Sequence, residues 1–206
     1  MKNKMPILLT FMILIGCAIK PELSPVSIFQ VDIGKDGKIY FELNDTHAKV
    51  VPKNRTNLPG IHHDVDENNY LPEAFVPYLK NNIIRNITKS PGIDVLSSLD
   101  GAEFHVDFNL QYFDVYRETS GGAAAAAILV GGLLGAALMR ESCTAEISGQ
   151  VSITDINTGN VLCTFYPEVK ETVEFSMNDS KTGYRNATQN AATELVKQII
   201  TGLSNC

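Results

Sequence analysis

The sequence of 206 residues predicts an α+β domain in which an antiparallel meander sheet has two helices packed on one face. Three observations predict this fold class. The segments 103–116 and 144–154 alternate apolar and polar residues, which is typical of strands with one buried face, and two further strands are expected at 161–166 and 169–176. The segments 72–89 and 183–203 repeat apolar residues every three or four positions, which is typical of helices. With 44% hydrophobic and 19% charged residues, the composition is that of a folded chain.

The first residues have the pattern of an export signal. Lys2 and Lys4 precede an apolar run, residues 7–15, that is short for a bilayer span. The run ends in Leu14-Ile15-Gly16-Cys17, which resembles the lipobox of bacterial lipoproteins. This resemblance implies that residues 1–16 are a lipoprotein signal peptide, that Cys17 is acylated, and that the mature protein is anchored in the outer membrane. The alternative is an ordinary signal peptide with an incidental cysteine.

The next residues are expected to lead from the lipid into the folded domain. Residues 17–26 contain two prolines and are expected to be the acylated cysteine and its tether, and residues 27–206 to form a single periplasmic domain. Apolar runs at 28–33 and 38–43 flank an Asp-Gly pair, which predicts a β-hairpin because a tight turn there needs positive φ. Residues 52–70 are polar and turn-rich and are expected to form a solvated loop without a metal.

Two helices are expected to supply the apolar face that covers the sheet. In the first, Pro72 suits the first turn, and the apolar stripe consists of Phe75, Val76, Leu79, Ile83, Ile84 and Ile87. Its polar residues are expected on the outer face; they are Asn81, Asn82, Arg85 and Asn86. The second helix, 183–203, has a stripe of Ala187, Ala191, Ala192, Leu195, Val196, Ile199, Ile200 and Leu203, which is expected to be buried.

The strands are expected to follow one another as a meander. A short apolar segment at 93–96 is followed by 103–116, where the alternation becomes ambiguous after Tyr112 and indicates a bulge. Strand 144–154 is followed by a turn at 155–160 and by a partner strand at 161–166. A further strand at 169–176 follows Pro167.

Three cysteines follow Cys17, and an oxidising compartment would allow one disulfide. Counting back from the turn at 157–159 places Cys163 opposite Ile153, so a bridge within that hairpin is not expected. The candidate pair is Cys143 with Cys206, because a disulfide between them would tie the last helix to the sheet, and the sequence leaves the pairing open. The third thiol would then be left over.

The segment 121–139 breaks the pattern because it is apolar, rich in Gly and Ala, and uncharged. As a helix it would be about 28 Å long, close to the thickness of a hydrocarbon core. Gly131 and Gly135 have the spacing of small residues at helix contacts in membranes. We expect Gly131, Leu133, Leu134 and Gly135 to contact a membrane or a second copy. The alternative is a helix or loop that packs against the domain.

The sequence contains none of the signatures of the common catalytic or cofactor sites, so no enzyme activity and no cofactor are expected. A net charge of −6 argues against a nucleic-acid-binding surface, which needs clustered Lys and Arg, so no nucleic-acid partner is expected. Asp100-Gly101-Ala102-Glu103-Phe104, and Asp155 to Leu162 with its Thr-Gly turn, resemble the envelope accessory lipoproteins of the curli secretion channel and LpoB type. The resemblance covers residues 70–203, and the first hairpin and the apolar insertion depart from it.

This resemblance implies a non-catalytic outer-membrane lipoprotein whose periplasmic domain helps to assemble or hold an envelope complex, with a protein partner or further copies of itself. The alternative is a lipoprotein that binds a small ligand or a lipid in a pocket covered by the insertion.

Overall fold

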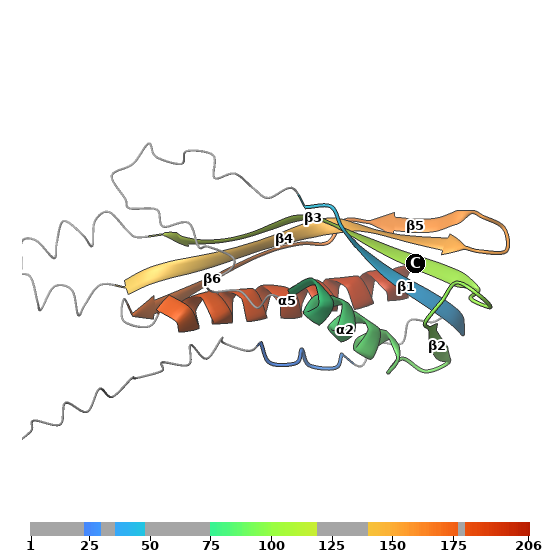
Figure 1. Cartoon of the computed structure of the whole chain (residues 1–206), viewed down its shortest axis with the longest axis horizontal. Coiled ribbons are helices and arrows are strands. Elements are labelled where there is room, and N and C mark those ends of the chain that lie inside the picture. Colours follow the sequence, from blue (N-terminus) through green and yellow to red (C-terminus); the bar gives the residue numbers. More distant parts are fainter. Residues whose placement is uncertain (1–22, 30–35, 48–74, 119–139, 177–179) are drawn as a thin grey trace, which may run out of the picture.

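A computed structural model describes residues 23–29, 36–47, 75–118, 140–176 and 180–206. In chain order, the elements are β1 (Gly37–Asp45), α2 (Phe75–Ile87), β2 (Ile93–Leu96), β3 (Phe104–Glu118), β4 (Arg140–Asp155), β5 (Val161–Phe165), β6 (Glu168–Ser176) and α5 (Ser180–Asn205). The strands form one open sheet, and both helices cover the same face of it (Figure 1). The predicted α+β class with two helices on one face is confirmed.

The sheet is mixed, so the expectation of a purely antiparallel meander is wrong. Its strand order is β2-β1-β3-β4-β5, and β6 pairs with the other half of β4. Strand β1 is parallel to both of its neighbours, β2 and β3. The chain leaves β1, passes through α2 and returns in β2, and such a helical crossover is the connection that parallel strands need. The meander is confirmed only from β3 to β6.

The predicted hairpin of 28–33 with 38–43 is also wrong. Both edges of β1 are occupied by β2 and β3, which leaves no edge for a hairpin partner. Residues 28–29 are not in a strand, and residues 30–35 lie outside the described part. Gly37 does have positive φ, but its N–H donates to the carbonyl of Gly92 and so fixes the start of β1 beside β2.

Strands β3 and β4 form the long hairpin at the centre of the sheet. Their pairing runs from Phe104 opposite Asp155 to Glu118 opposite Ser142, with a register shift between Leu110 and Tyr112. The extra residue, Gln111, changes which side chains face the helices. The buried residues are Val106, Phe108 and Leu110 before it, and Phe113 and Val115 after it. The predicted bulge is confirmed, just before Tyr112, and it explains the ambiguous alternation.

The helices bury the stripes that the spacing predicts. Every residue of the predicted α5 stripe, from Ala187 to Leu203, is buried, and α2 buries Phe75, Leu79, Ile83 and Ile87. Helix α2 ends at Ile87, and the predicted start at Pro72 lies outside the described part. Of the helices in the described ranges, neither combines the length and the apolar character that crossing a bilayer requires.

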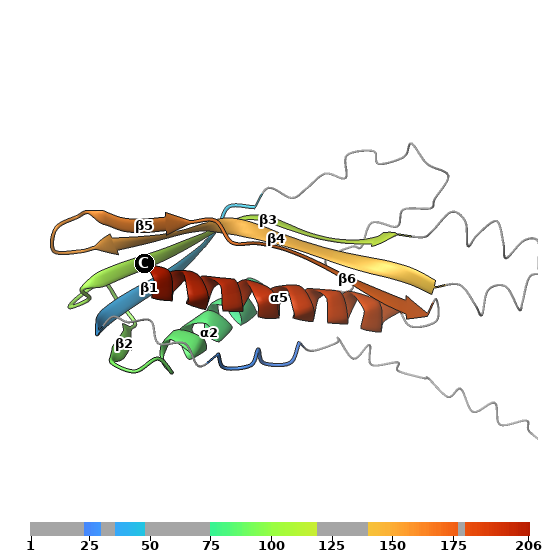
Figure 2. The same ribbon diagram turned by 180° about the vertical axis from the view of Figure 1, so that it is seen from behind.

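The disulfide joins Cys163 to Cys206, with 5.7 Å between their Cα atoms, so the predicted pair of Cys143 and Cys206 is wrong. Cys143 lies opposite Val173, close to where α5 begins. The 26 residues of α5 carry Cys206 about 39 Å away from that end. The C-terminus therefore lies beside β5, as both cartoon views show (Figure 2). The predicted position of Cys163 opposite Ile153 is confirmed.

Candidate functional site: the N-terminal segment bound along helix α2

Helix α2 buries two asparagines that the sequence pattern assigns to its outer face. Asn82 is 5% exposed and Asn86 is 0% exposed. Asparagine is a poor helix former and is costly to bury unless its amide is hydrogen-bonded. The pair therefore marks a place where α2 binds another part of the chain. The prediction of an outer position is wrong for both residues, whereas Asn81 is exposed.

The part of the chain that they bind is the segment Leu23–Phe29. The N–H of Val26 donates to Asn82 Oδ1 at 2.9 Å, and the N–H of Phe29 donates to Asn86 Oδ1 at 2.8 Å. The amide nitrogens of the same asparagines donate along the helix, from Asn82 to the carbonyl of Tyr78 and from Asn86 to the carbonyl of Asn82. Each amide thus uses both of its ends, which fixes its orientation.

Two longer side chains of α2 hold the carbonyls of the same segment. Arg85 Nη2 donates to the carbonyl of Val26. Tyr78 OH donates to the carbonyl of Ser24 at 2.7 Å and accepts from Gln189 Nε2 of α5 at 3.0 Å. Burial is the largest cause that raises the pKa of Tyr78, and it outweighs the opposing effects of Gln189 and Arg85. The phenol therefore stays protonated and available as a donor.

Apolar contacts complete the docking of the segment. The Val26 side chain is 1% exposed and belongs to the core, and Leu23 and Phe29 pack against that core. Burying a valine contributes about 1.5–3 kcal/mol, and each hydrogen bond about 0.5–1.5 kcal/mol. Leu23–Val26, which the sequence assigns to the tether, are therefore bound to the domain.

The direction of the segment is set by the order of its contacts. Ser24, Val26 and Phe29 meet Tyr78, Asn82 and Asn86 in turn, so the segment runs in the same direction as α2. Its Leu23 end lies at the Phe75 end of the helix. The Phe75 ring stacks on Phe113 of β3 with 4.3 Å between centroids. From Phe113, β3 continues to Glu118, which pairs with Ser142 of β4, and we call this end of the two strands the β3–β4 end.

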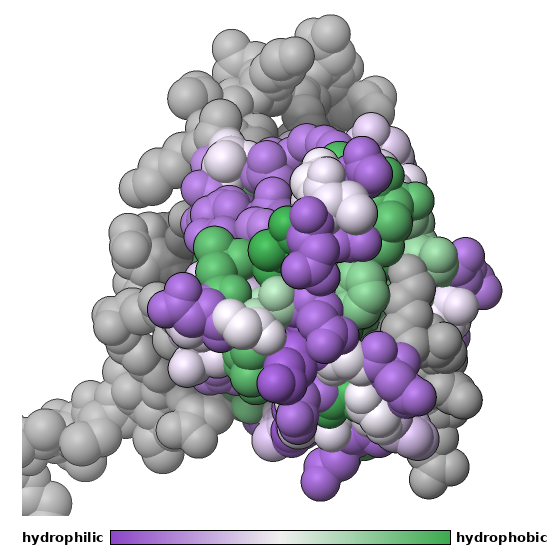
Figure 3. Space-filling view, turned by 90° about the vertical axis from the view of Figure 1, so that its right-hand side faces the viewer, coloured by the Kyte–Doolittle hydropathy of each residue, from purple (hydrophilic) through white to green (hydrophobic). Residues whose placement is uncertain are grey.

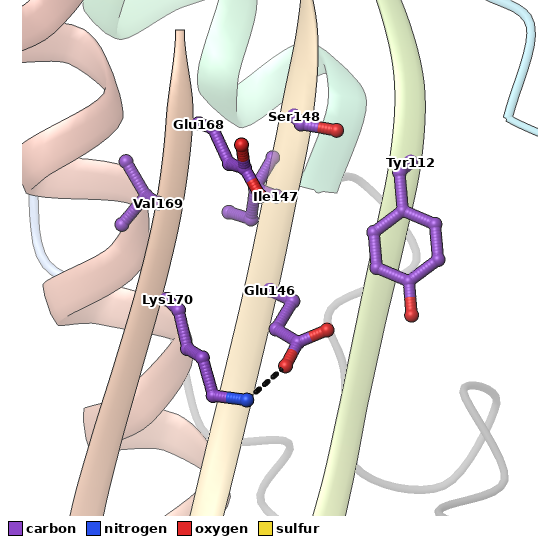
Figure 4. A pocket seen from close by; sticks show the side chains of 7 residues that line it. All are labelled: Tyr112, Glu146, Ile147, Ser148, Glu168, Val169 and Lys170. Carbon is purple, nitrogen blue, oxygen red and sulfur yellow. Dashed lines mark hydrogen bonds and ion pairs between the residues drawn. The ribbon is translucent and has the colours of Figure 1, made fainter.

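The opposite face of the sheet has a polar pocket of about 220 Å³ over β3, β4 and β6. Figure 4 shows Lys170 and Glu146 directed toward each other across neighbouring strands, and Nζ lies 2.5 Å from Oε1. Tyr116 OH donates to the same carboxylate at 2.7 Å. The pocket is lined by Tyr112, Glu146, Ile147, Ser148, Glu168, Val169 and Lys170.

The chemistry of this pocket is that of a cross-strand ion pair. The hydrogen bond to Glu146, and then the one to Tyr116, raise the pKa of Lys170 above its ordinary range. A nucleophilic or basic lysine needs a lowered pKa, so this arrangement does not activate Lys170 for catalysis. Within the described ranges, no group of three His, Cys, Asp or Glu side chains is arranged to hold a metal.

Several large apolar side chains are exposed around β5, at the end of the sheet where β4 turns back. Val161 is 60% exposed, Tyr166 68%, and Leu162 and Ile156 are also exposed. Figure 3 looks onto this end of the molecule and shows hydrophobic residues among hydrophilic ones. We call these four residues the hairpin patch.

The remaining residues predicted to be functional lie outside the described residues. They are Cys17, Gly131, Leu133, Leu134 and Gly135. Sequence reasoning missed Asn82 and Asn86, although their spacing offered a signal. Positions 75, 79, 82, 83, 86 and 87 together complete one helical stripe, so both asparagines fall at buried positions.

No protein-family model matches the sequence, and no curated protein matches it. Among solved structures, protein XCC0632 of family DUF330 from Xanthomonas campestris is similar with a TM-score of 0.54 and 11% identity, over 87% of this chain and 94% of that chain. A Helicobacter pylori protein, described as a neuraminyllactose-binding hemagglutinin homologue, has a TM-score of 0.52 and 9% identity, over 88% and 91%.

A minor lipoprotein from Acinetobacter baumannii overlaps more loosely, with a TM-score of 0.39 and 12% identity over 82% and 91% of the two chains, and that score supports no conclusion. At these identities the likeness to the Xanthomonas and Helicobacter proteins shows a shared fold alone. The chain has the α+β fold of those two bacterial proteins.

Proposed function

We propose that the protein is a non-catalytic lipoprotein of the bacterial outer membrane. In this proposal, acylated Cys17 anchors a periplasmic domain that helps to assemble or hold an envelope complex. The observation on which the proposal rests is the segment Leu23–Phe29, bound to α2 by its backbone. Only six residue steps separate Cys17 from Leu23, which span at most about 22 Å. A lipid on Cys17 would therefore hold the folded domain close to the bilayer.

The flanks of the apolar insertion support a second contact in the same region. Glu118 and Arg140 are the described residues that precede and follow the insertion, and they lie at the β3–β4 end, where Glu118 pairs with Ser142. The Leu23 end of the docked segment lies at the Phe75 end of α2, and Phe75 stacks on Phe113 of β3, five residues before Glu118. This arrangement favours our proposal that Gly131, Leu133, Leu134 and Gly135 contact the membrane or a further copy of the protein.

The hairpin patch supports a protein partner. Exposed large apolar side chains that gather at one end of a domain are typical of an interaction surface. Three such side chains, Ile156, Val161 and Leu162, occur at the turn end of β4 and β5. Tyr166 follows the other end of β5, and this strand, Val161–Phe165, has no charged residue.

The first test is membrane fractionation of three forms: wild type, Cys17→Ser, and Cys17→Ser without residues 121–139. We expect wild type in the outer-membrane fraction with an incorporated fatty acid, and no fatty acid in either variant. Wild type in the soluble fraction without a fatty acid would contradict a lipoprotein. Release of Cys17→Ser shows that the lipid alone anchors the domain, whereas release only after the deletion shows that the insertion binds lipid.

The contact role of the insertion needs its own variant. Replacing Gly131 and Gly135 with leucine removes the small-residue spacing, so we expect chemical cross-linking between copies, or to a partner, to fall. Unchanged cross-linking would refute this role and favour the alternative that the domain binds a small ligand or a lipid.

A further inference from the structure

We propose that the docked segment Leu23–Phe29 orients the domain on the bilayer. The β3–β4 end, where Glu118 pairs with Ser142, faces the lipid headgroups, and the hairpin patch is directed away from them. The partner of the β3–β4 end is thus a lipid surface. This inference rests on the proposed function, because it needs a lipid on Cys17. It adds a fixed orientation, which acylation alone does not give.

The docked segment has a single register on α2, which is the first requirement for a fixed orientation. Val26 is buried, its N–H is bound by Asn82, and its carbonyl is bound by Arg85. Three residues further along, Asn86 binds the N–H of Phe29. A shift of the segment by one residue would move Val26 out of its buried position, and in one direction it would place Pro25, which has no N–H, opposite Asn82.

The length of chain between the lipid and the docked segment decides which end of the domain can reach the bilayer. The Leu23 end of the segment lies near the level of Phe113, because Phe75 at that end of α2 stacks on the Phe113 ring. From Phe113, β3 runs five residues to Glu118, or about 17 Å. In the other direction it runs nine residues to Phe104, or about 30 Å.

The reach of the linker matches one of these distances and not the other. Six residue steps from Leu23 to Cys17 span at most about 22 Å, which is enough to bring the β3–β4 end to the bilayer. The same linker is too short to bring down the opposite end, where Asp155 pairs with Phe104 and the hairpin patch begins. The patch is therefore held away from the lipid, where a protein partner can reach it.

Two positions on α5 allow a matched measurement of this orientation. Asn186 and Thr201 are both exposed, lie on the same helix, and are 15 residues or about 22 Å apart along it. Asn186 belongs to the end of α5 that follows β6, and Thr201 to the end that is tied to β5 through Cys206. A donor dye on Asn186→Cys or Thr201→Cys reports the height of each end, because Cys143 is buried and Cys163 is in the disulfide.

The experiment uses the full lipidated protein on phosphatidylethanolamine and phosphatidylglycerol vesicles with an acceptor dye on the headgroups. We expect energy transfer about two-fold higher from position 186 than from position 201, given their separation of about 22 Å. Equal transfer, or higher transfer from position 201, on vesicles that carry the protein would overturn the orientation. Failure of wild type to float with the vesicles would instead overturn the proposed lipoprotein function.

Variants of α2 test whether the docked segment causes the difference. The double variant Asn82→Ala/Asn86→Ala releases the segment, so we expect the two transfer values to converge while the protein still floats. Asn81→Ala, an exposed neighbour on the same helix, should keep the difference. Circular dichroism checks that the double variant is folded, and Asn86→Ala alone replaces it if it is not. A difference that persists in a folded variant with a released segment would refute the orienting role.

Discussion

The contact between Asn86 and the N-terminal segment can be measured against a control on the same helix. Asn86 is fully buried, accepts from the N–H of Phe29 at 2.8 Å and donates to the carbonyl of Asn82 at 2.9 Å. In Asn86→Ala, the Phe29 N–H loses its partner, which costs about 1–3 kcal/mol. Alanine returns roughly 0.5–0.7 kcal/mol because it is the better helix former. The expected net loss is about 0.3–2.5 kcal/mol.

Asn81→Ala removes the same side chain from an exposed position five residues earlier. Only the gain in helix propensity applies there, so we expect the free energy of unfolding to rise by roughly 0.5 kcal/mol. Urea titrations of both variants give the difference, with equal slopes as the condition for comparing midpoints. Amide exchange of residues 23–29 should accelerate only in Asn86→Ala. Equal stability changes in the two variants, or unchanged exchange in both, would refute the docking argument.

Three further predictions concern the rest of the domain. Cys206→Ser removes the disulfide to Cys163, which closes a loop of 43 residues. The chain-entropy relation predicts that the free energy of unfolding in urea falls by about 4 kcal/mol under oxidising conditions. Wild type and variant should not differ once both are reduced. The pKa of Tyr78 is raised above 10.0, so its contribution to stability is complete below pH 10 and is lost as the pH rises through the folded pKa. Thermal midpoints should therefore fall less steeply at alkaline pH in Tyr78→Phe than in wild type. Gly149→Ala places a Cβ 2.4 Å from the Asn109 carbonyl and 2.5 Å from the Phe108 ring, and we expect a loss of about 1–3 kcal/mol by thermal denaturation, with an unchanged midpoint as the contrary result.

The helices and the central hairpin could be predicted because their signals are local. The α5 stripe from Ala187 to Leu203 is fixed by a spacing of three and four residues, and the bulge at Gln111 shows as a change in alternation. The parallel position of β1 could not be predicted in this way. Its partners at 93–96 and 104–110 are more than fifty residues away, and nothing in residues 37–45 indicates which edges they pair with.

The candidate site shows the same limit. The asparagines of α2 are polar, so hydrophobic spacing assigns them to solvent, although two of the three bind the backbone of Leu23–Phe29. Backbone recognition leaves almost no mark on the recognised residues, because any N–H serves. The predicted pairing of Cys143 with Cys206 is wrong for a geometric reason. Helix α5 is long enough to carry Cys206 past Cys143 to the far end of the sheet. The lipobox cysteine and the apolar insertion remain predictions from sequence.

The place of β1 between β2 and β3 has a consequence for the order of folding. Strands β3 to β6 and α5 are neighbours that follow one another in the chain. In contrast, β1 can pair only with β2 and β3, which come later in the chain. Closing that long loop costs entropy before any contact repays it, so we expect the C-terminal part to form first and β1 to insert last. Pulse-labelled amide exchange would show protection of β4 before β1. The N-terminal half, which supplies β1, α2 and β2, would therefore complete a sheet that the C-terminal half has already formed.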